Sequence, residues 1–219
     1  MNQIDICVIH AQPIEKYPPA QNLLTFLGQE TELNVLFIVG SGVAPGSEYI
    51  IPIRDRFQVE IMHIETNQGL GWKLSFIKFV KTHTASKNLK CLYAYGDEFS
   101  ASCSLLFKAT SRAVHFHELT KPLSLLRKFS TKFLETWYLQ KTLRRFDWIT
   151  QVTPARAAIF ARDFSCSCDH LYNFPPRQFS SQIQSFERTS DSVRLIYIGT
   201  CNPESIRIDL PQLIAAEPN

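Results

Sequence analysis

Residues 92–122 read LYAYGDEFSASCSLLFKATSRAVHFHELTKP, and this stretch decides the fold class. An apolar run over 89–95 predicts a buried strand that meets Gly96, and the apolar positions beyond it predict a helix over 100–109. A second short apolar run, 113–116, predicts the next strand. A strand, a helix and a strand in such close succession predict a βαβ unit with two parallel strands.

The same alternation extends along the chain on both sides of this unit. Further strands are predicted at 4–9, 33–39, 57–64, 148–152 and 170–174, and further helices from residue 20 and over 72–80, 123–145 and 154–162. We therefore predict an α/β protein with a Rossmann-like, doubly wound parallel sheet. Ligands of such sheets bind beyond the carboxyl ends of the strands, near the point where the strand order reverses.

Composition and charge exclude several classes of protein. With 219 residues, 45% of them hydrophobic, the chain is long enough to bury one ordinary globular core. A net charge of +3 is too small to indicate nucleic-acid binding, so no nucleic acid is expected as a partner. The sequence has no apolar run of about 18 residues and no signal peptide, which predicts a cytoplasmic location.

Histidines stand in two of the loops that follow predicted strands, at 10–19 and 115–122. Strand alternation places His115 and His117 on one side of the strand and Phe116 on the other. An imidazole titrates near neutrality, so His117 and the adjacent Glu118 are the candidate catalytic pair. The alternative interpretation is a buried structural histidine next to a surface or helix-capping carboxylate.

Neither a redox cofactor nor a metal is predicted. The loop 40–46 (GSGVAPG) has neither the spacing of a dinucleotide fingerprint nor the Lys-Ser/Thr ending of a phosphate loop. No Asp-x-Asp pair occurs in a strand-end loop, and Cys166, Cys168 and His170 lack a second pair of zinc ligands at suitable spacing.

The segment 121–145 carries seven basic residues against one acid. Apolar and aromatic positions, among them Trp137, recur within it at helical spacing. A basic amphipathic helix with aromatic residues can lie on an anionic membrane surface, and the alternative is a core-packing helix with a solvated basic face. The candidate membrane-surface residues are Arg127, Lys128, Lys132, Trp137, Lys141, Arg144 and Arg145.

The order and spacing of several segments resemble those of a known protein family. The segments are DICVIHAQPIEKYPPAQNLL, the opening stretch, RRFDWITQVTPARAAIFARDF, LYNFPPR and RLIYIGTC. Together they resemble the N-terminal half of two-domain GT-B glycosyltransferases, particularly of the family 4 type. The resemblance covers essentially the whole chain through the order and spacing of loose motifs.

This resemblance implies roles for particular residues. In such enzymes the N-terminal domain mainly binds the acceptor and the C-terminal domain holds the nucleotide sugar, usually without a required metal. The pair His117-Glu118 resembles the family's His-Asp/Glu pair after the fifth strand. The substrate-binding candidates, from the loops after the first and fourth strands, are His10, Lys16, Tyr17, Asp97 and Glu98.

The resemblance also implies a division of the chain. Residues 1–174 would form the Rossmann-like domain, the polar, proline-flanked stretch 175–192 a linker, and 193–219 the start of an absent donor-binding domain. The expected protein is thus half of an enzyme of surface-polysaccharide synthesis, inactive or nearly so alone. It would meet a nucleotide-sugar donor only with a second domain or subunit, and its acceptor would be a glycan or a lipid-linked glycan.

Two alternatives remain open at this point. The first is a membrane-associated, acceptor-binding subunit of a split glycosyltransferase, peripheral to the inner face of the membrane. The second is a small Rossmann-like enzyme of unrelated chemistry, such as an epimerase or reductase. That enzyme would need tight cofactor binding by this one domain.

Overall fold

The computed structural model describes residues 3–30, 32–42, 57–63, 69–118 and 131–173. All of these belong to the first of two units of the chain, Met1–Gln182. The predicted linker and the predicted remnant at 193–219 lie outside the described residues, and so does the loop 43–56.

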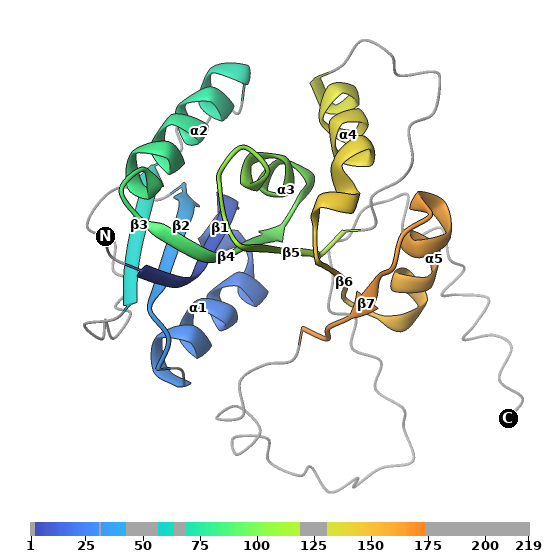
Figure 1. Cartoon of the computed structure of the whole chain (residues 1–219), viewed down its shortest axis with the longest axis horizontal. Coiled ribbons are helices and arrows are strands. Elements are labelled where there is room, and N and C mark those ends of the chain that lie inside the picture. Colours follow the sequence, from blue (N-terminus) through green and yellow to red (C-terminus); the bar gives the residue numbers. More distant parts are fainter. Residues whose placement is uncertain (1–2, 31, 43–56, 64–68, 119–130, 174–219) are drawn as a thin grey trace, which may run out of the picture. The chain divides into compact units, whose positions relative to one another are not determined.

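A parallel sheet forms the centre of this unit (Figure 1). Its strand order is β3-β2-β1-β4-β5-β6-β7, and every described pairing is parallel. The order reverses between β1 and β4, as in a doubly wound sheet, which confirms the predicted fold class. The strands are β1 (Gln3–Pro13), β2 (Val35–Ser41), β3 (Phe57–His63), β4 (Asn88–Gly96), β5 (Ser111–Phe116), β6 (Trp148–Gln151) and β7 (Asp169–His170).

The described helices cover both faces of the sheet unequally. Leu24 of α1 packs on one face with Val8 and Phe37, whereas α2, α3, α4 and α5 pack on the other. Right-handed crossovers produce this arrangement, because the chain moves one way from β1 to β3 and the opposite way from β3 to β7. The helices are α1 (Pro18–Glu30), α2 (Leu70–Thr84), α3 (Glu98–Ser104), α4 (Thr131–Thr142) and α5 (Pro154–Phe164), with 3-10 turns η1 (Ile14–Lys16) and η3 (Leu143–Arg145).

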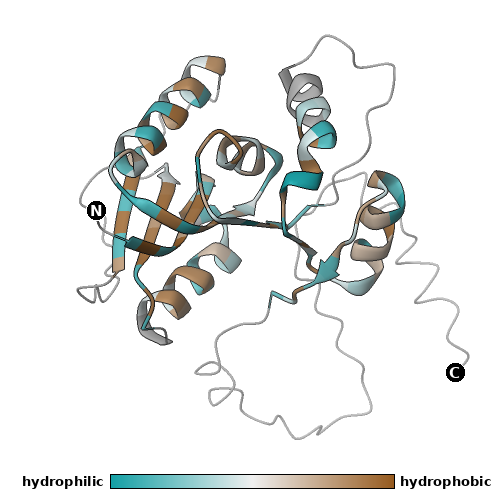
Figure 2. Cartoon of the chain, in the orientation of Figure 1, coloured by the Kyte–Doolittle hydropathy of each residue, from teal (hydrophilic) through white to brown (hydrophobic). Residues whose placement is uncertain are grey.

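Burial explains which segments became strands. Every residue of β2 is buried, as expected for a strand inside a two-faced sheet, and Phe37 is fully enclosed. The edge strand β3 is only partly buried along its length. Figure 2 shows the same contrast, with hydrophobic central strands and helices that carry both hydrophobic and hydrophilic residues.

Side-chain caps define the starts of two helices. The Asp97 carboxylate accepts from the Ser100 amide at 2.6 Å, so α3 begins at Glu98 rather than at the predicted residue 100. It ends at Ser104, five residues before the predicted end. Thr153 caps α5 in the same way by accepting from the Arg156 amide at 3.2 Å.

Several predicted boundaries were wrong. β1 continues through Pro13, and its pairing with β2 shifts register between His10 and Pro13, so the predicted loop starts later. The predicted helix 123–145 ends at Thr142, whose hydroxyl bonds back to the Tyr138 carbonyl, and a 3-10 turn follows; residues 123–130 lie outside the described residues. The last predicted strand has only the two residues of β7.

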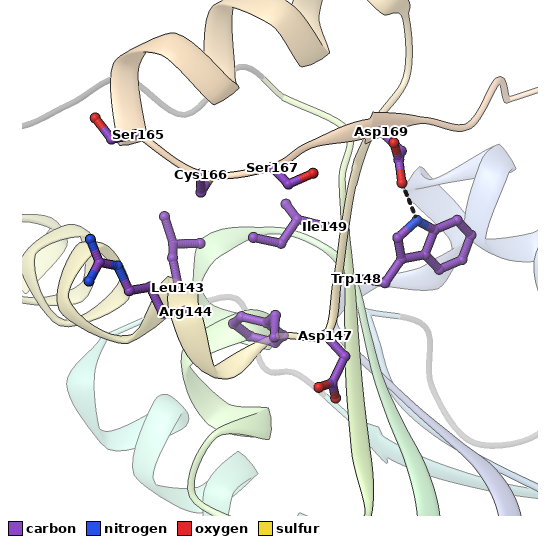
Figure 3. Close-up of a pocket in the computed structure, with 10 residues that line it drawn as sticks. Leu143, Arg144, Asp147, Trp148, Ile149, Ser165, Cys166, Ser167 and Asp169 are labelled. Carbon is purple, nitrogen blue, oxygen red and sulfur yellow. Dashed lines mark hydrogen bonds between the residues drawn. The ribbon is translucent and has the colours of Figure 1, made fainter.

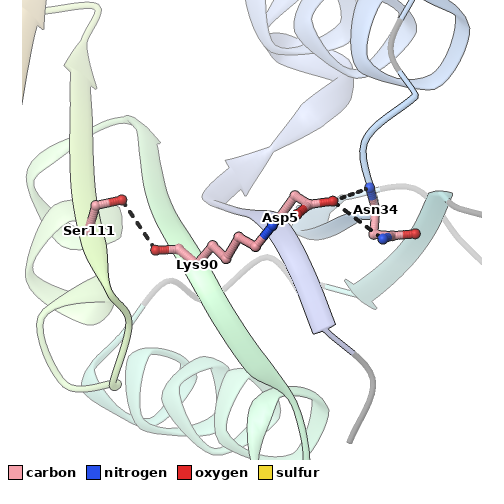
Figure 4. A network of polar contacts seen from close by, with 4 residues as sticks. All are labelled: Asp5, Asn34, Lys90 and Ser111. Atoms are coloured by element: carbon pink, nitrogen blue, oxygen red, sulfur yellow. Dashed lines mark hydrogen bonds and ion pairs between the residues drawn. The ribbon is translucent and has the colours of Figure 1, made fainter.

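A polar network joins four segments at the amino edge of the sheet (Figure 4). Asp5 of β1 accepts from the Asn34 amide at 3.0 Å and from Lys90 of β4 at 2.6 Å, and Ser111 of β5 donates to the Lys90 carbonyl. Lys90 and Asn34 hold the pKa of Asp5 below its ordinary value. This edge is occupied by structural contacts, whereas the carboxyl edge carries the candidate site.

Candidate functional site

The carboxyl ends of β1, β4 and β5 converge at the point where strand order reverses. His10 lies near the end of β1, Gly96 ends β4, and His117 follows β5 directly. The His117 amide donates to the Gly96 carbonyl at 3.1 Å, which continues the ladder between β4 and β5 by one bond. The Ala11 amide donates to Ser100 Oγ at 2.9 Å and so ties β1 to α3 at the register shift.

The backbone conformation and the close neighbours of residue 96 both require a glycine at this position. Its φ is +110°, a conformation that L side chains rarely adopt. A Cβ at this position would lie 3.0 Å from His10 Nδ1 and 3.4 Å from His117 Cδ2. The two imidazoles therefore flank the glycine, and its missing side chain gives them the space to approach.

Tyr95 is the centre of an aromatic cluster on the α1 face of the sheet. Its ring stacks on His115 at a centroid distance of 5.1 Å and meets the His117 ring edge-on at 4.6 Å. The Tyr95 carbonyl accepts from His10 Nδ1 at 2.8 Å. Tyr17 completes the cluster by edge contacts with His10 and His117.

Hydrogen bonds from three directions hold His117. Besides the bond to Gly96, its carbonyl accepts from Arg156 Nη1 of α5 at 2.7 Å. Its ring Nδ1 accepts from Asn173 Nδ2 at 3.0 Å. His115 is anchored separately, with Nδ1 2.8 Å from Thr150 Oγ1 of β6.

Burial keeps these imidazoles neutral. It lowers the pKa of His115 to about 4. Burial and the neighbouring histidines lower the pKa of His117 to about 3, and burial lowers the pKa of His10 as well. Within the described part of the chain, Nε2 of each ring is buried and has no hydrogen-bond partner. Buried polar atoms are normally paired, so three such atoms together indicate a place for a ligand.

Carboxylates adjoin this cluster. Asp97 caps α3 with Oδ1, while its Oδ2 is buried without a partner among the described residues. Burial raises the pKa of Tyr17, and the nearby negative charges of Asp97 and Glu118 raise it further. Tyr17 therefore lies near both carboxylates and in contact with the histidines.

The structure thus brings five of the seven predicted site residues together: His10, Tyr17, Asp97, His117 and Glu118. The candidate catalytic pair differs in burial, because His117 is 8% exposed and Glu118 is on the surface. Lys16 is exposed at the end of η1, and Glu98 is half-buried in the first turn of α3. Neither belongs to the ring cluster.

Sequence reasoning missed the importance of Tyr95, Gly96, Arg156 and Asn173. Strand alternation could have found Tyr95, since it is paired with His115 in the register between β4 and β5. No local signal marks Arg156 or Asn173, because they reach His117 from segments 39 and 56 residues away in sequence.

The basic segment is described only in its last part. Trp137 is 48% exposed, so it is not packed in the core as the alternative interpretation of this helix would require. Leu139 and Leu143 are buried instead and pack against α3. Lys141, Arg144 and Arg145 are exposed, whereas Arg127, Lys128 and the side chain of Lys132 lie outside the description.

A pocket of about 290 Å³ lies at the other edge of the sheet, where β6 and β7 begin (Figure 3). Its walls include Leu143, Ile149 and Cys166, and at its side Trp148 Nε1 donates to Asp169 Oδ2 at 2.8 Å. Ligands of doubly wound sheets bind at the carboxyl edge, so we place the candidate site at the histidines and not in this pocket.

Comparison with known proteins gives a structural likeness but no match in sequence. No protein-family model matches the sequence, and no curated protein matches it significantly. Among solved structures, a sucrose-phosphate synthase from Thermosynechococcus elongatus matches with a TM-score of 0.50 and 10% identity, over 83% of this chain and 93% of that one. The described fold is like one half of the GT-B fold. At this identity the likeness concerns the fold alone.

Among the residues that the structure describes, no three His, Cys, Asp or Glu side chains are grouped as metal ligands. In the same residues, no helix is both long and apolar enough to cross a membrane.

Proposed function

We propose that this chain is the acceptor-side half of a family 4-like glycosyltransferase, which transfers a sugar from a nucleotide sugar to a glycan or glycolipid in surface-polysaccharide synthesis. The observation that carries the proposal is the pair of neutral imidazoles, His10 and His117, on either side of Gly96 at the carboxyl edge of a GT-B-like half. Fold likeness supplies the reaction class, and the unpaired ring nitrogens supply the groups that would meet a substrate.

The chemistry of the cluster suits sugar hydroxyls. In glycosyl transfer the sugar gains oxocarbenium character while the leaving diphosphate gains negative charge. Neutral imidazoles and carboxylates such as Asp97 can exchange hydrogen bonds with hydroxyl groups. Arg156, whose guanidinium reaches this cluster, is already engaged with the His117 carbonyl. We infer that a second domain or subunit provides the cations that hold the diphosphate, and that the isolated chain has little or no activity.

The test is turnover by the completed enzyme. The chain is combined with a donor domain, fused or co-expressed, and nucleoside diphosphate release is measured over a panel of nucleotide sugars. His117→Ala should lower turnover at least tenfold, in the range of a lost positioned catalytic or binding group. His83→Ala serves as the matched control, because His83 lies on α2 and pairs with Glu60 away from the cluster.

Two results would contradict the proposal. One is the absence of release with every nucleotide sugar, although the assembled protein is folded. The other is equal turnover of the wild type and the His117→Ala variant, which would remove His117 from the site.

A second candidate function is a membrane-associated acceptor-binding subunit of a split glycosyltransferase, located at the inner face of the membrane. The exposed Trp137 favours it, together with the exposed Lys141, Arg144 and Arg145 that follow within eight residues. An exposed tryptophan with neighbouring cations is suited to an anionic lipid surface.

Vesicle sedimentation tests this second candidate. Each cation near an anionic surface contributes about 1 kcal/mol, so replacing both Arg144 and Arg145 by Ala should weaken binding to anionic vesicles roughly thirtyfold. A matched double replacement of the exposed Lys78 and Lys81 on α2 should have little effect. Equal binding to neutral and anionic vesicles would exclude this candidate.

A further inference from the structure

Among the described residues, the ring of His117 has a hydrogen-bond partner on Nδ1 and none on Nε2. Asn173 Nδ2 lies 3.0 Å from His117 Nδ1, and an amide nitrogen is a donor without acceptor capacity. Nδ1 must therefore carry a lone pair, and the single proton of the neutral ring resides on Nε2. Asn173 also lies near His115 and opposes the effect of burial on the pKa of that ring. Asn173 thus faces both histidines.

His10 has the opposite arrangement. Its Nδ1 lies 2.8 Å from the Tyr95 carbonyl oxygen, which can only accept. Nδ1 of His10 therefore carries the proton, and Nε2 carries the lone pair. At the site, His117 offers a buried N–H donor and His10 a buried acceptor, neither with a partner among the described residues.

We propose that Asn173 is a positioning residue that fixes His117 in the Nε2–H tautomer, so that His117 donates to a substrate oxygen while His10 accepts from a substrate hydroxyl. The assignment of the two tautomers follows from the contacts of Asn173 and Tyr95. The roles of the two rings toward a substrate rest on the proposed glycosyl transfer. Asn173 follows β7 and is remote from β5 in sequence. It can therefore determine which ring nitrogen donates at the site only once the domain has folded.

The backbone contacts of His117 separate the role of Asn173 from simple packing. Its carbonyl is held by Arg156, and its amide by Gly96, so the ring stays at the site when the Asn173 side chain changes. The contribution of Asn173 alone is to determine which ring nitrogen of His117 carries the proton. Asn173→Asp tests this choice with almost no change in shape, because a carboxylate accepts where the amide donated.

The experiment is nitrogen-detected tautomer analysis by NMR of the ¹⁵N-histidine-labelled full chain at pH 7.5. The His117 signals are assigned by their loss in a His117→Gln variant. In the wild type we expect the proton on Nε2 and a lone pair on Nδ1. In Asn173→Asp we expect Nδ1 of His117 to become protonated, and in Asn173→Ala a mixture of the two tautomers.

Three results would overturn the proposal. The first is a wild-type His117 protonated on Nδ1, which needs no variant to be seen. The second is an unprotonated Nδ1 in folded Asn173→Asp. The third is an equal change in Leu171→Ala, a neighbouring replacement that leaves the amide intact, since this would make loop placement the cause.

The readout requires no sugar nucleotide, so it is separate from the test of the proposed function. A confirmed tautomer in a protein that transfers no sugar would remove the glycosyl-transfer proposal and leave the role of Asn173 at His117 in place. With both confirmed, turnover of the completed enzyme should fall in Asn173→Asp and persist in Leu171→Ala.

Discussion

Acid should destabilise this protein well above the pH at which carboxylates titrate. His115 and His117 have an ordinary pKa of 6.5, which the fold lowers to about 4 and about 3, respectively. Below pH 6.5 the unfolded chain binds protons at these two rings, whereas the folded chain does not until the pH approaches 4. The stabilisation is therefore complete above pH 6.5 and is lost progressively as the pH falls.

The magnitude follows from proton linkage. Each pH unit below 6.5 costs about 1.4 kcal/mol per ring that is neutral in the fold and protonated when unfolded. Between pH 7.5 and pH 5.0 the loss is about 2 kcal/mol for each ring, or about 4 kcal/mol for both. This is a large part of the roughly 5–15 kcal/mol that stabilises a typical domain. Local opening of the cluster would let the rings titrate without global unfolding, so the figure is an upper bound for these two rings; the buried His10, whose pKa is also lowered, adds to the loss.

Urea unfolding followed by circular dichroism at pH 7.5, 6.5, 5.5 and 5.0 measures this loss. The double replacement of His115 and His117 by Gln should abolish most of the pH dependence in this window. His83→Gln, on α2 and outside the cluster, is the control for replacing a histidine by Gln. The reasoning fails if the wild type has the same free energy of unfolding at pH 7.5 and 5.0, or if the double variant keeps the full slope.

Three stability predictions follow from single contacts and can be measured by the same unfolding assay at pH 7.5. Gly96→Ala should cost about 1–3 kcal/mol, because it places a side chain at a φ of +110° and against the His10 ring; an unchanged midpoint would contradict that backbone conformation. Thr153→Ala should cost about 1 kcal/mol through loss of the α5 cap, while Thr153→Ser, which keeps the hydroxyl, should restore most of it. Phe160→Ala should cost about 3–5 kcal/mol, because the ring is fully buried and stacks on Phe116; a loss below 1 kcal/mol would mean that α5 is not docked as described.

The elements of the fold could be predicted because their causes are local. Continuous apolar runs such as β2 form strands buried on both faces, and their alternation with helical segments predicts a parallel sheet. Boundaries were less predictable. The Asp97 cap begins α3 early, and the register shift after His10 lengthens β1; both depend on side chains or strands that meet only in the fold.

Candidate residues at strand ends could also be named from the sequence, since the carboxyl edge of a doubly wound sheet is where ligands bind. Strand-end reasoning singled out His117 and Glu118, the resemblance to GT-B enzymes added His10, Tyr17 and Asp97, and the structure brings these five together. Lys16 was named for the same reason and lies exposed on η1. A loop assignment gives the neighbourhood of a residue but not the direction of its side chain.

Tertiary structure alone determines that the imidazoles are neutral and which of their ring nitrogens donate or accept hydrogen bonds. Sequence determined that imidazoles would stand at the ends of β1 and β5, because apolar runs place those strands and the histidines follow them. It could not show that burial keeps the rings neutral, because burial depends on the whole packed sheet. Nor could it show which nitrogen of His117 holds the proton, because that depends on Asn173, a partner 56 residues further along the chain.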